Sequence, residues 1–473
     1  MNLGYLLIVL TLTQLTRAER SLRLTTIDTS KMDMVKPSRI VSMVNKLDNP
    51  KAEASWRKET TSVMIITEDE LLRHEIVERV VNDLKVAEDN IRVEVLPEVK
   101  VKNSFRLQKR SEKMFDLNFF NTLESINDYL EELAHSNPDL VFTKTIGYSY
   151  ENRPIKVLII SLNDGVIKPK IFFDGGQHAR EWISPAVLLS MAQKLIKGYR
   201  EDDHKLKKLV ERYEFHILPV LNPDGYVFTY KDDGIRLWRK NRRNTTNSYC
   251  AGVDLNRNWD FHWSGRGGST DRCSIVYQGE APFSEGETLS AANYILERKG
   301  EWHSYFSFHS FGQMILFPYS HTQLLGPDYV KHMTAGRKLS ESVKSVNGRN
   351  YAVGPVGMLL YEASGSSESW AYSVGVPYTY TVELPDRKTF VVPPEIIEPT
   401  AKEWVEGLAA YIEFIEMSDA ELYGELVANI TILNPTTTSE PRIQAAFDDS
   451  HAASLIPSLH LLISYFIAVI LFS

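Results

Sequence analysis

The 473-residue chain contains only two cysteines, Cys250 and Cys273. Two thiols are too few for a cysteine-ligated zinc cluster or a disulfide-rich scaffold, although they suffice for one bridge. The sequence also has no long basic run, and its formal net charge is −8, so we expect no nucleic-acid partner. A hydrophobic content of 43% is enough for a full globular core, and the length predicts two domains or one large domain with appendages.

The N-terminal region lacks a lysine or arginine ahead of its apolar segment, Leu3–Leu12, so the free amine must supply the positive charge. Residues 1–18 are otherwise typical of a secretory signal peptide, with a cleavage site at Thr16-Arg17-Ala18. A buried N-terminal strand is the alternative. We therefore expect the secretory pathway and an extracellular location, where a disulfide can form.

Residues 19–110 form a distinct section that is predicted to be a small α+β unit, an open sandwich. Ser62–Thr67 and Ile91–Leu96 have the composition of strands, and Glu68–Val86 carries apolar residues at helical spacing. The section ends at the dibasic pair Lys109-Arg110 in a polar stretch. Such a pair in an exposed loop is a site for a processing protease; the alternative is a solvated charge pair in a linker.

Residues 111–417 alternate between helical and strand patterns, which predicts an α/β domain with a mixed, largely parallel central sheet. We expect strands at Val141–Ile146, Ile155–Ser161, Lys170–Asp174, Tyr213–Leu218, Tyr305–His309, Met314–Phe317 and Tyr378–Glu383. Helices are expected at Leu117–Ala134 (capped by Asn118 or Asn121), Ser184–Tyr199, Glu285–Lys299, Pro327–Ser345 and Pro394–Met417.

The chain beyond Met417 shows no such alternation. Residues 418–450 form a polar linker, and residues 451–473 form a hydrophobic C-terminal tail. The apolar part, Leu455–Phe472, is short for a spanning helix and is followed by no basic residue. Small residues ahead of it are typical of a glycolipid (GPI) anchor signal, with a single-pass membrane anchor as the alternative.

A histidine and a glutamate three residues apart, His178 and Glu181, follow the apolar run Ile171–Phe173 and a glycine turn. Placed at the end of a strand, an imidazole and a carboxylate can reach one zinc ion. An isolated pair of this kind also occurs often by chance, and a solvated turn then explains it better than a metal site. Further ionisable residues, however, occur at the ends of other apolar runs, where functional residues gather in open α/β sheets. These segments are Arg236–Arg242, Asp254–Trp259, Phe306–Phe311, Leu360–Gly365 and Tyr380–Leu384.

Together these motifs resemble the metallocarboxypeptidase family of the pancreatic carboxypeptidase A and B type, from about Ser111 to Met417. The resemblance implies the carboxypeptidase fold, with helices on both faces of the sheet. It implies one Zn²⁺ per chain, held by His178, Glu181 and His309, with Asp254 bonded to the first histidine. The separation of the two cysteines agrees with the family's disulfide, so Cys250 and Cys273 are expected to pair.

The resemblance also implies a mechanism. Glu383 is the expected general base for a water whose pKa the zinc lowers, and Arg239 is expected to face the developing oxyanion. Arginine pairs a carboxylate with a planar fork, which suits recognition of a peptide's C-terminus. The substrate-binding residues implied are Arg180, Asn256, Arg257, Ser310, Tyr361 and Glu368.

Glu368 lies where B-type enzymes carry an acidic residue, so we predict a preference for C-terminal Lys or Arg. An A-type preference for apolar or aromatic residues is the alternative, and a catalytically silent peptide-binding homologue is a further one. The sequence departs from the family at Phe311 and Pro385, where tyrosine and arginine are usual, and at Ser369, where aspartate is common.

The resemblance makes residues 19–110 an inhibitory pro-domain that an activating protease removes after Arg110. The expected product is a monomer that acts on peptide or protein C-termini and is tethered to the extracellular membrane face by its tail. Asn244 and Asn429 stand in glycosylation sequons.

Overall fold

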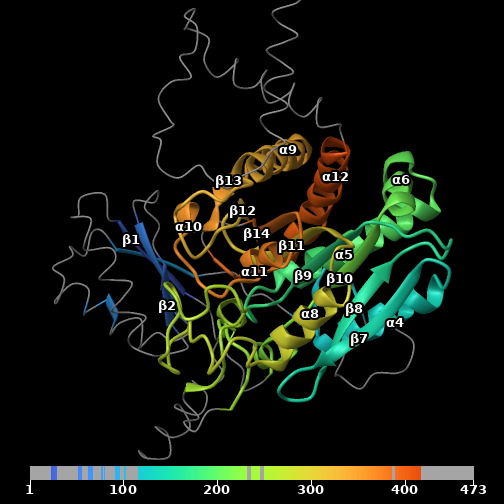
Figure 1. Cartoon of the computed structure of the whole chain (residues 1–473). Helices are drawn as coiled ribbons and strands as arrows, with labels where there is room; N and C mark the ends of the chain where they lie inside the picture. The colour runs from blue at the N-terminus through green and yellow to red at the C-terminus, as the bar shows by residue number, and fades with distance from the viewer. Residues whose placement is uncertain are drawn as a thin grey trace, which may run out of the picture. The chain divides into compact units, whose positions relative to one another are not determined.

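The computed structural model describes residues 115–231, 236–244, 250–385 and 389–416, residues 76, 77 and 79, and five strands nearer the N-terminus. Four of these strands form an antiparallel sheet in the order β2-β3-β1-β4 (Figure 1). Their bounds are β1 (Arg23–Asp28), β2 (Ala52–Ser55), β3 (Ser62–Thr67) and β4 (Ile91–Val95). The helix expected at Glu68–Val86 lies mostly outside the described residues. The strands at Ser62 and Ile91 are confirmed, whereas the open sandwich stays a prediction.

The larger sheet has eight strands in the order β13-β12-β14-β11-β9-β10-β8-β7. Strand β9 pairs in parallel with β10 and β11, β11 with β14, and β12 with β13, while the remaining pairs are antiparallel. The predicted mixed, largely parallel sheet is therefore confirmed. The bounds are β7 (Val141–Tyr148), β8 (Pro154–Ile160), β9 (Lys170–Gly175), β10 (Glu214–Leu218), β11 (Trp302–Ser310), β12 (Met314–Phe317), β13 (Ala352–Pro355) and β14 (Tyr378–Leu384). A short strand, β6 (Phe120–Asn121), pairs in parallel with β5 (Val101–Lys102).

Helices cover both faces of this sheet (Figure 1). Successive side chains along a strand point to opposite faces of the sheet, which explains how both faces become apolar. Phe172 packs against Tyr294 of α8, with ring centroids 6.0 Å apart, while its neighbour Phe173 stacks on Phe306 on the opposite face. Phe306 in turn meets Tyr411 of α12. The main helices are α4 (Leu123–Ser136), α5 (Ile183–Arg200), α6 (His204–Arg212), α8 (Gly286–Leu296), α9 (Tyr329–Asn347) and α12 (Ile397–Ile415). Shorter ones are α7 (Pro223–Phe228), η3 (Leu255–Arg257), α10 (Val356–Leu359), α11 (Ser367–Ser373) and η4 (Pro394–Ile396).

The first helix of this domain begins later than predicted. Helix α4 is capped by Thr122, whose hydroxyl accepts a hydrogen bond from the Ser125 backbone N–H, and not by Asn118 or Asn121. Asn121 instead donates its side-chain amide to the Asp116 and Phe119 carbonyls. This local side-chain bonding competes with helix formation and holds the preceding residues in a turn.

Candidate active site

Three side chains that are far apart in the sequence converge at the carboxyl ends of β9 and β11. His178 Nδ1 lies 2.8 Å from Glu181 Oε1 and 3.1 Å from His309 Nδ1, and His309 Nδ1 lies 3.1 Å from Glu181 Oε2. Ligands about 2.0–2.1 Å from a tetrahedral zinc lie about 3.3 Å from one another. The two imidazoles and the carboxylate, all buried, therefore fit one zinc ion with a position left for water.

A glycine turn positions the first two ligands. Gly176 has φ +60°, and a Cβ there would come within 3.2 Å of the Pro219 carbonyl oxygen. Only glycine adopts this backbone without strain. The chain can therefore reverse directly after β9 and present His178 and Glu181 ahead of α5.

The pKa shifts of His178 and Glu181 suit a cation. Burial lowers the pKa of His178, which favours the neutral imidazole that a metal requires. Burial alone would raise the pKa of Glu181, but the charges and hydrogen bonds of His178 and His309 outweigh it and lower the pKa. For His309, burial is outweighed by Glu181, and the pKa is raised. The carboxylate thus stays ionised at the centre of the site.

A buried carboxylate links the first histidine to an arginine. Asp254 Oδ1 lies 3.2 Å from His178 Nε2, and Asp254 Oδ2 accepts hydrogen bonds from Arg239 Nε at 3.1 Å and Nη2 at 2.9 Å. Burial would raise the pKa of Asp254, but the charges of Arg239 and Arg257 hold it well below its usual range. One ionised carboxylate therefore lies against a zinc ligand and holds the guanidinium that enters the cavity.

The site opens into a cavity of about 440 Å³, a size typical of ligand pockets. Each predicted metal, catalytic and substrate residue lines it, apart from Asp254, which lies behind His178. These residues are His178, Arg180, Glu181, Arg239, Asn256, Arg257, His309, Ser310, Tyr361, Glu368 and Glu383.

Strand register places Glu383 beside the metal site. Strands β11 and β14 run in parallel, and their register pairs His309 with Glu383. Both side chains line the cavity. The carboxylate predicted to act as the base is therefore next to a zinc ligand although 74 residues separate them in the sequence.

The arginines predicted to bind substrate are held by other groups of the cavity wall. Arg257 donates from Nε to the Gly267 carbonyl at 2.8 Å and from Nη1 to the Asn256 carbonyl at 2.7 Å. The guanidinium of Arg180 lies 4.0 Å from the ring centroid of Phe390. Phe390 also contacts Phe311, one of the residues that depart from the family.

Glu368 lies in the first turn of α11 and is 1% exposed. Its Oε1 accepts hydrogen bonds from Ser366 and Ser369, each at 2.8 Å, and its Oε2 accepts one from Thr381 at 3.3 Å. Ser369, which stands where the family commonly has aspartate, thus serves as a donor to Glu368. The carboxylate faces the cavity with three hydroxyl partners.

Residues 126–407 match the family model for zinc carboxypeptidases, a span of more than half the chain. The chain belongs to the zinc carboxypeptidase family. It is a metallocarboxypeptidase whose zinc is held by His178, Glu181 and His309. The family match favours an active enzyme over a catalytically silent homologue. It also indicates that the substrates are peptides.

Similar proteins include a zinc carboxypeptidase A 1 from Anopheles gambiae, 38% identical over 310 residues, which are 64% of this chain and 70% of the relative. Carboxypeptidase A2 from Mus musculus is 36% identical over 337 residues, 71% of this chain and 78% of the relative. A crystal structure of thrombin activatable fibrinolysis inhibitor is similar with a TM-score of 0.71 at 28% identity, covering 83% of this chain and 98% of the other. These two relatives by sequence carry A-type names, whereas Glu368 led us to predict the B-type preference.

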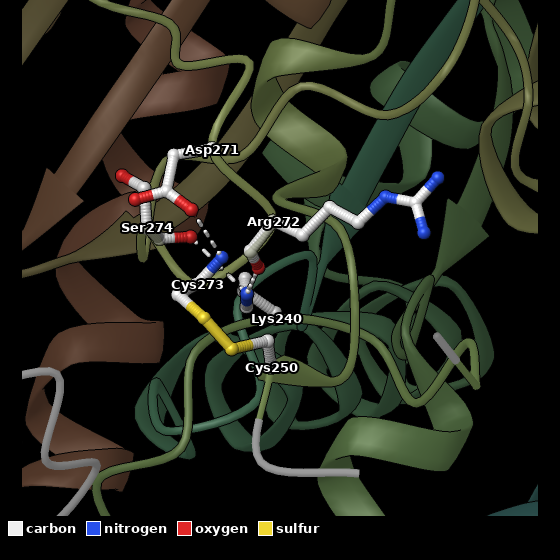
Figure 2. The surroundings of a disulfide bond; sticks show 6 residues. All are labelled: Lys240, Cys250, Asp271, Arg272, Cys273 and Ser274. Atoms are coloured by element: carbon white, nitrogen blue, oxygen red, sulfur yellow. Dashed lines mark hydrogen bonds between the residues drawn. A yellow bond between two sulfur atoms is a disulfide. The ribbon is translucent and has the colours of Figure 1, made fainter. Parts of the chain in front are cut away.

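The predicted disulfide of this carboxypeptidase is confirmed, since Cys250 and Cys273 are bonded. Figure 2 shows the bond beside Lys240, a buried residue whose ammonium donates to the Arg272 and Ser274 carbonyls at 2.9 and 3.1 Å. The disulfide is consistent with the predicted secretory route. Sequence reasoning gave Lys240 no role.

Several predictions concern other parts of the carboxypeptidase. Asn244 is exposed, as a glycosylation site requires. Asn429, Arg110, the signal peptide, the linker and the tail lie outside the described residues. Within the part of the chain that the structure describes, no helix is long and apolar enough to cross a membrane.

Proposed function

We propose that this enzyme hydrolyses the C-terminal peptide bond of peptides with Glu383 as the general base. The observation that carries the proposal is the β11–β14 register, which sets Glu383 beside His309 in the cavity that also holds the arginines. Zinc held by His178, Glu181 and His309 would supply a Lewis acid to the scissile carbonyl and to a water molecule. Glu383 would take a proton from the attacking water and then deliver it to the leaving amine.

Arg239 stabilises the negative charge that develops on the carbonyl oxygen. Burial opposes its charge, but Asp254, Tyr361 and Glu181 raise its pKa, so it remains a cation throughout the reaction. The two hydrogen bonds to Asp254 hold the guanidinium in place before the substrate arrives. A fixed cation of this kind stabilises the transition state without reorganisation.

Arg257 binds the terminal carboxylate of the substrate, with Asn256, Tyr361 and Arg180 as further contacts. Two of its nitrogens are fixed on backbone carbonyls, so the guanidinium is oriented before binding. A planar, pre-oriented fork accepts a carboxylate with little loss of side-chain entropy. The requirement for a free carboxylate makes the enzyme an exopeptidase.

For the C-terminal side chain, the names of the relatives support the A-type preference for apolar or aromatic residues, which we adopt. The three hydroxyl partners of Glu368 also support a structural role for that carboxylate. A Lys or Arg preference is the second candidate. It rests on Glu368 lining the cavity with no lysine or arginine paired to it among the described residues.

The test compares wild-type enzyme with Glu383→Gln on hippuryl-Phe and hippuryl-Arg. We expect kcat to fall by a factor of about 10³ in the variant, a value within the usual range for loss of a general base, with one zinc still bound. Glu362→Gln is the control, because this cavity carboxylate is paired with Arg266 at 2.8 Å. A fully active Glu383→Gln enzyme would refute the proposal, and a wild-type preference for hippuryl-Arg would support the second candidate.

We further propose that the enzyme is made as a zymogen, enters the secretory pathway and is anchored by a glycolipid. The dibasic site at Arg110 supports the zymogen, and the terminal apolar tail supports the glycolipid anchor. Cutting after Arg110 should raise activity sharply, and unchanged activity would contradict inhibition by residues 19–110.

Release from membranes by a phosphoinositide-specific phospholipase tests the glycolipid, whereas retention would indicate a membrane-spanning tail.

A further inference from the structure

The second zinc histidine differs from the first in what supports it from behind. His178 has the carboxylate of Asp254 directly at its Nε2. His309 Nε2 instead lies 3.0 Å from the hydroxyl oxygen of Ser307. Because period-two alternation puts residues 307 and 309 on one face of β11, the hydroxyl supports the imidazole from within the same strand.

The Ser307 hydroxyl continues to a buried carboxylate. It lies 2.8 Å from Asp174 Oδ1, and the parallel register of β9 and β11 sets these two residues side by side. Asp174 is 1% exposed and ends the apolar run of β9. Sequence and topology therefore bring a carboxylate to the second histidine through one intervening hydroxyl.

The direction of these hydrogen bonds follows from the zinc site. His309 Nδ1 faces His178 and Glu181, so its lone pair belongs to the metal and the proton belongs to Nε2. Nε2–H then donates to Ser307 Oγ, and the Ser307 O–H donates to Asp174. With this direction the Ser307 hydroxyl accepts one hydrogen bond and donates one, and the proton on Nε2 fixes the tautomer that zinc needs.

A glutamine completes the surroundings of the pair. Gln177 Nε2 lies 3.4 Å from Asp174 Oδ1 and 3.3 Å from Ser307 Oγ, and the Trp259 indole N–H donates to Gln177 Oε1 at 3.1 Å. Among the described residues, Asp174 forms no ion pair with a lysine or arginine. A buried carboxylate is costly without a compensating charge. Through Ser307 and His309 this carboxylate reaches the positive charge that a bound metal would supply.

We propose that Asp174 is a positioning residue for zinc, acting on His309 through the hydroxyl of Ser307. The inference rests on the zinc site and not on the proposed base or C-terminal preference. Asp174 orients the ring and raises the basicity of Nδ1, as carboxylates behind metal-bound histidines do. The site therefore has two carboxylate supports, one direct on His178 and one relayed on His309.

The experiment measures zinc affinity by chelator competition on the full chain, so it does not depend on peptide hydrolysis. Asp174→Asn and Ser307→Ala should each weaken zinc binding about tenfold, in keeping with the loss of an outer hydrogen-bond partner. The double variant should be little weaker than either single variant, because both act through one chain. The Co²⁺-substituted variants should show shifted visible absorption bands.

Glu287→Gln is the matched control, since Glu287 is a fully buried carboxylate of α8 that contacts no zinc ligand. It should leave zinc affinity and the cobalt spectrum unchanged. Wild-type zinc affinity in both Asp174→Asn and Ser307→Ala would overturn the proposal. If Asp174→Asn fails to fold, Ser307→Ala alone decides, because it removes only one hydroxyl from the relay.

Discussion

At the scale of single residues, Glu368 decides how the cavity treats the last side chain of a substrate. Its carboxylate is buried and accepts hydrogen bonds from three hydroxyls. Hydroxyl donors can satisfy a carboxylate without a cation, although a lysine or arginine of the substrate would add a stronger partner. The two candidate preferences therefore predict different results for the same substitution.

Glu368→Gln keeps the size of the side chain and removes its charge. Since we adopt the apolar preference, we expect kcat/KM for hippuryl-Phe to change by less than about threefold, because uncharged hydrogen bonds to the hydroxyls remain. Steady-state kinetics on hippuryl-Phe and hippuryl-Arg provide the measurement. A loss of tenfold or more that is confined to hippuryl-Arg would instead identify Glu368 as the partner of a basic side chain.

The residues of the cavity differ in how far the sequence predicts them. The motif residues were predicted from their resemblance to the family, and all except Asp254 line one cavity, with Asp254 directly behind. Ser307 and Lys240 received no role, because a lone serine or lysine carries no local signal. The position of Ser307 two residues before His309 was the one available sign, since it implies a shared face of the strand.

At the scale of elements, the disulfide and Lys240 together hold one wall of the cavity. Lys240 directly follows Arg239, and its ammonium donates to two carbonyls on either side of Cys273 (Figure 2). Ile275 and Val276, which directly follow Ser274, line the cavity. The lysine thus links the segment that carries Arg239 to the segment that carries Ile275 and Val276.

Lys240→Met keeps the aliphatic chain and removes both charge-assisted hydrogen bonds. We expect unfolding free energy to fall by about 2 kcal/mol, the scale of such bonds, and KM to rise severalfold as the wall loosens. Calorimetry and steady-state kinetics test this pair of effects. Lys168→Met is the control, since this buried lysine pairs with Asp164 away from the cavity and should affect stability alone. An unchanged KM in Lys240→Met would contradict the link.

The bounds of the elements were predicted best where the pattern of apolar residues is clear. Strand β12 has the predicted bounds, and α5 differs by one residue at each end. The predicted helix at Leu117 was wrong in its first turns because side-chain bonds of Asn121 hold a turn there. Strand order was beyond prediction, because it depends on contacts between segments far apart in the sequence, such as Asp174 of β9 and Ser307 of β11, which are 133 residues apart.

At the scale of the whole molecule, the buried His332 and the half-buried His303 make stability depend on pH. Burial lowers the pKa of both His303 and His332 to about 4. In the unfolded chain both titrate near 6.5, so the unfolded state binds more protons between these values. The contribution of these two histidines to the unfolding free energy is therefore full above pH 6.5 and is lost as pH falls toward 4.

We expect the unfolding free energy to decrease by up to about 3 kcal/mol per histidine over this window, from about 1.4 kcal/mol for each unit of pKa. Urea unfolding at several pH values between 7 and 4 measures the decrease. His332→Gln should flatten the profile, whereas substitution of the exposed His204 should not. A profile unaffected by His332→Gln would show that other groups control acid stability.

The catalytic domain was predictable as a whole because alternating strands and helices specify a parallel sheet. The family match then supports the same fold independently. The boundaries at 18, 110, 417 and 450 stay predictions, since those residues lie outside the described part. Composition alone predicts these segments, and the packing of the described domain does not test them.

The zinc site also constrains the order of events during biosynthesis. His178 and His309 are separated by 131 residues, and Glu383 follows 74 residues later. No ribosome-bound chain that ends before His309 holds the complete ligand set, and one that ends before Glu383 lacks the proposed base. The complete zinc site can therefore form only after β11 has been synthesised and has paired with β9. A prematurely terminated chain cannot become a partly active peptidase inside the cell that makes it.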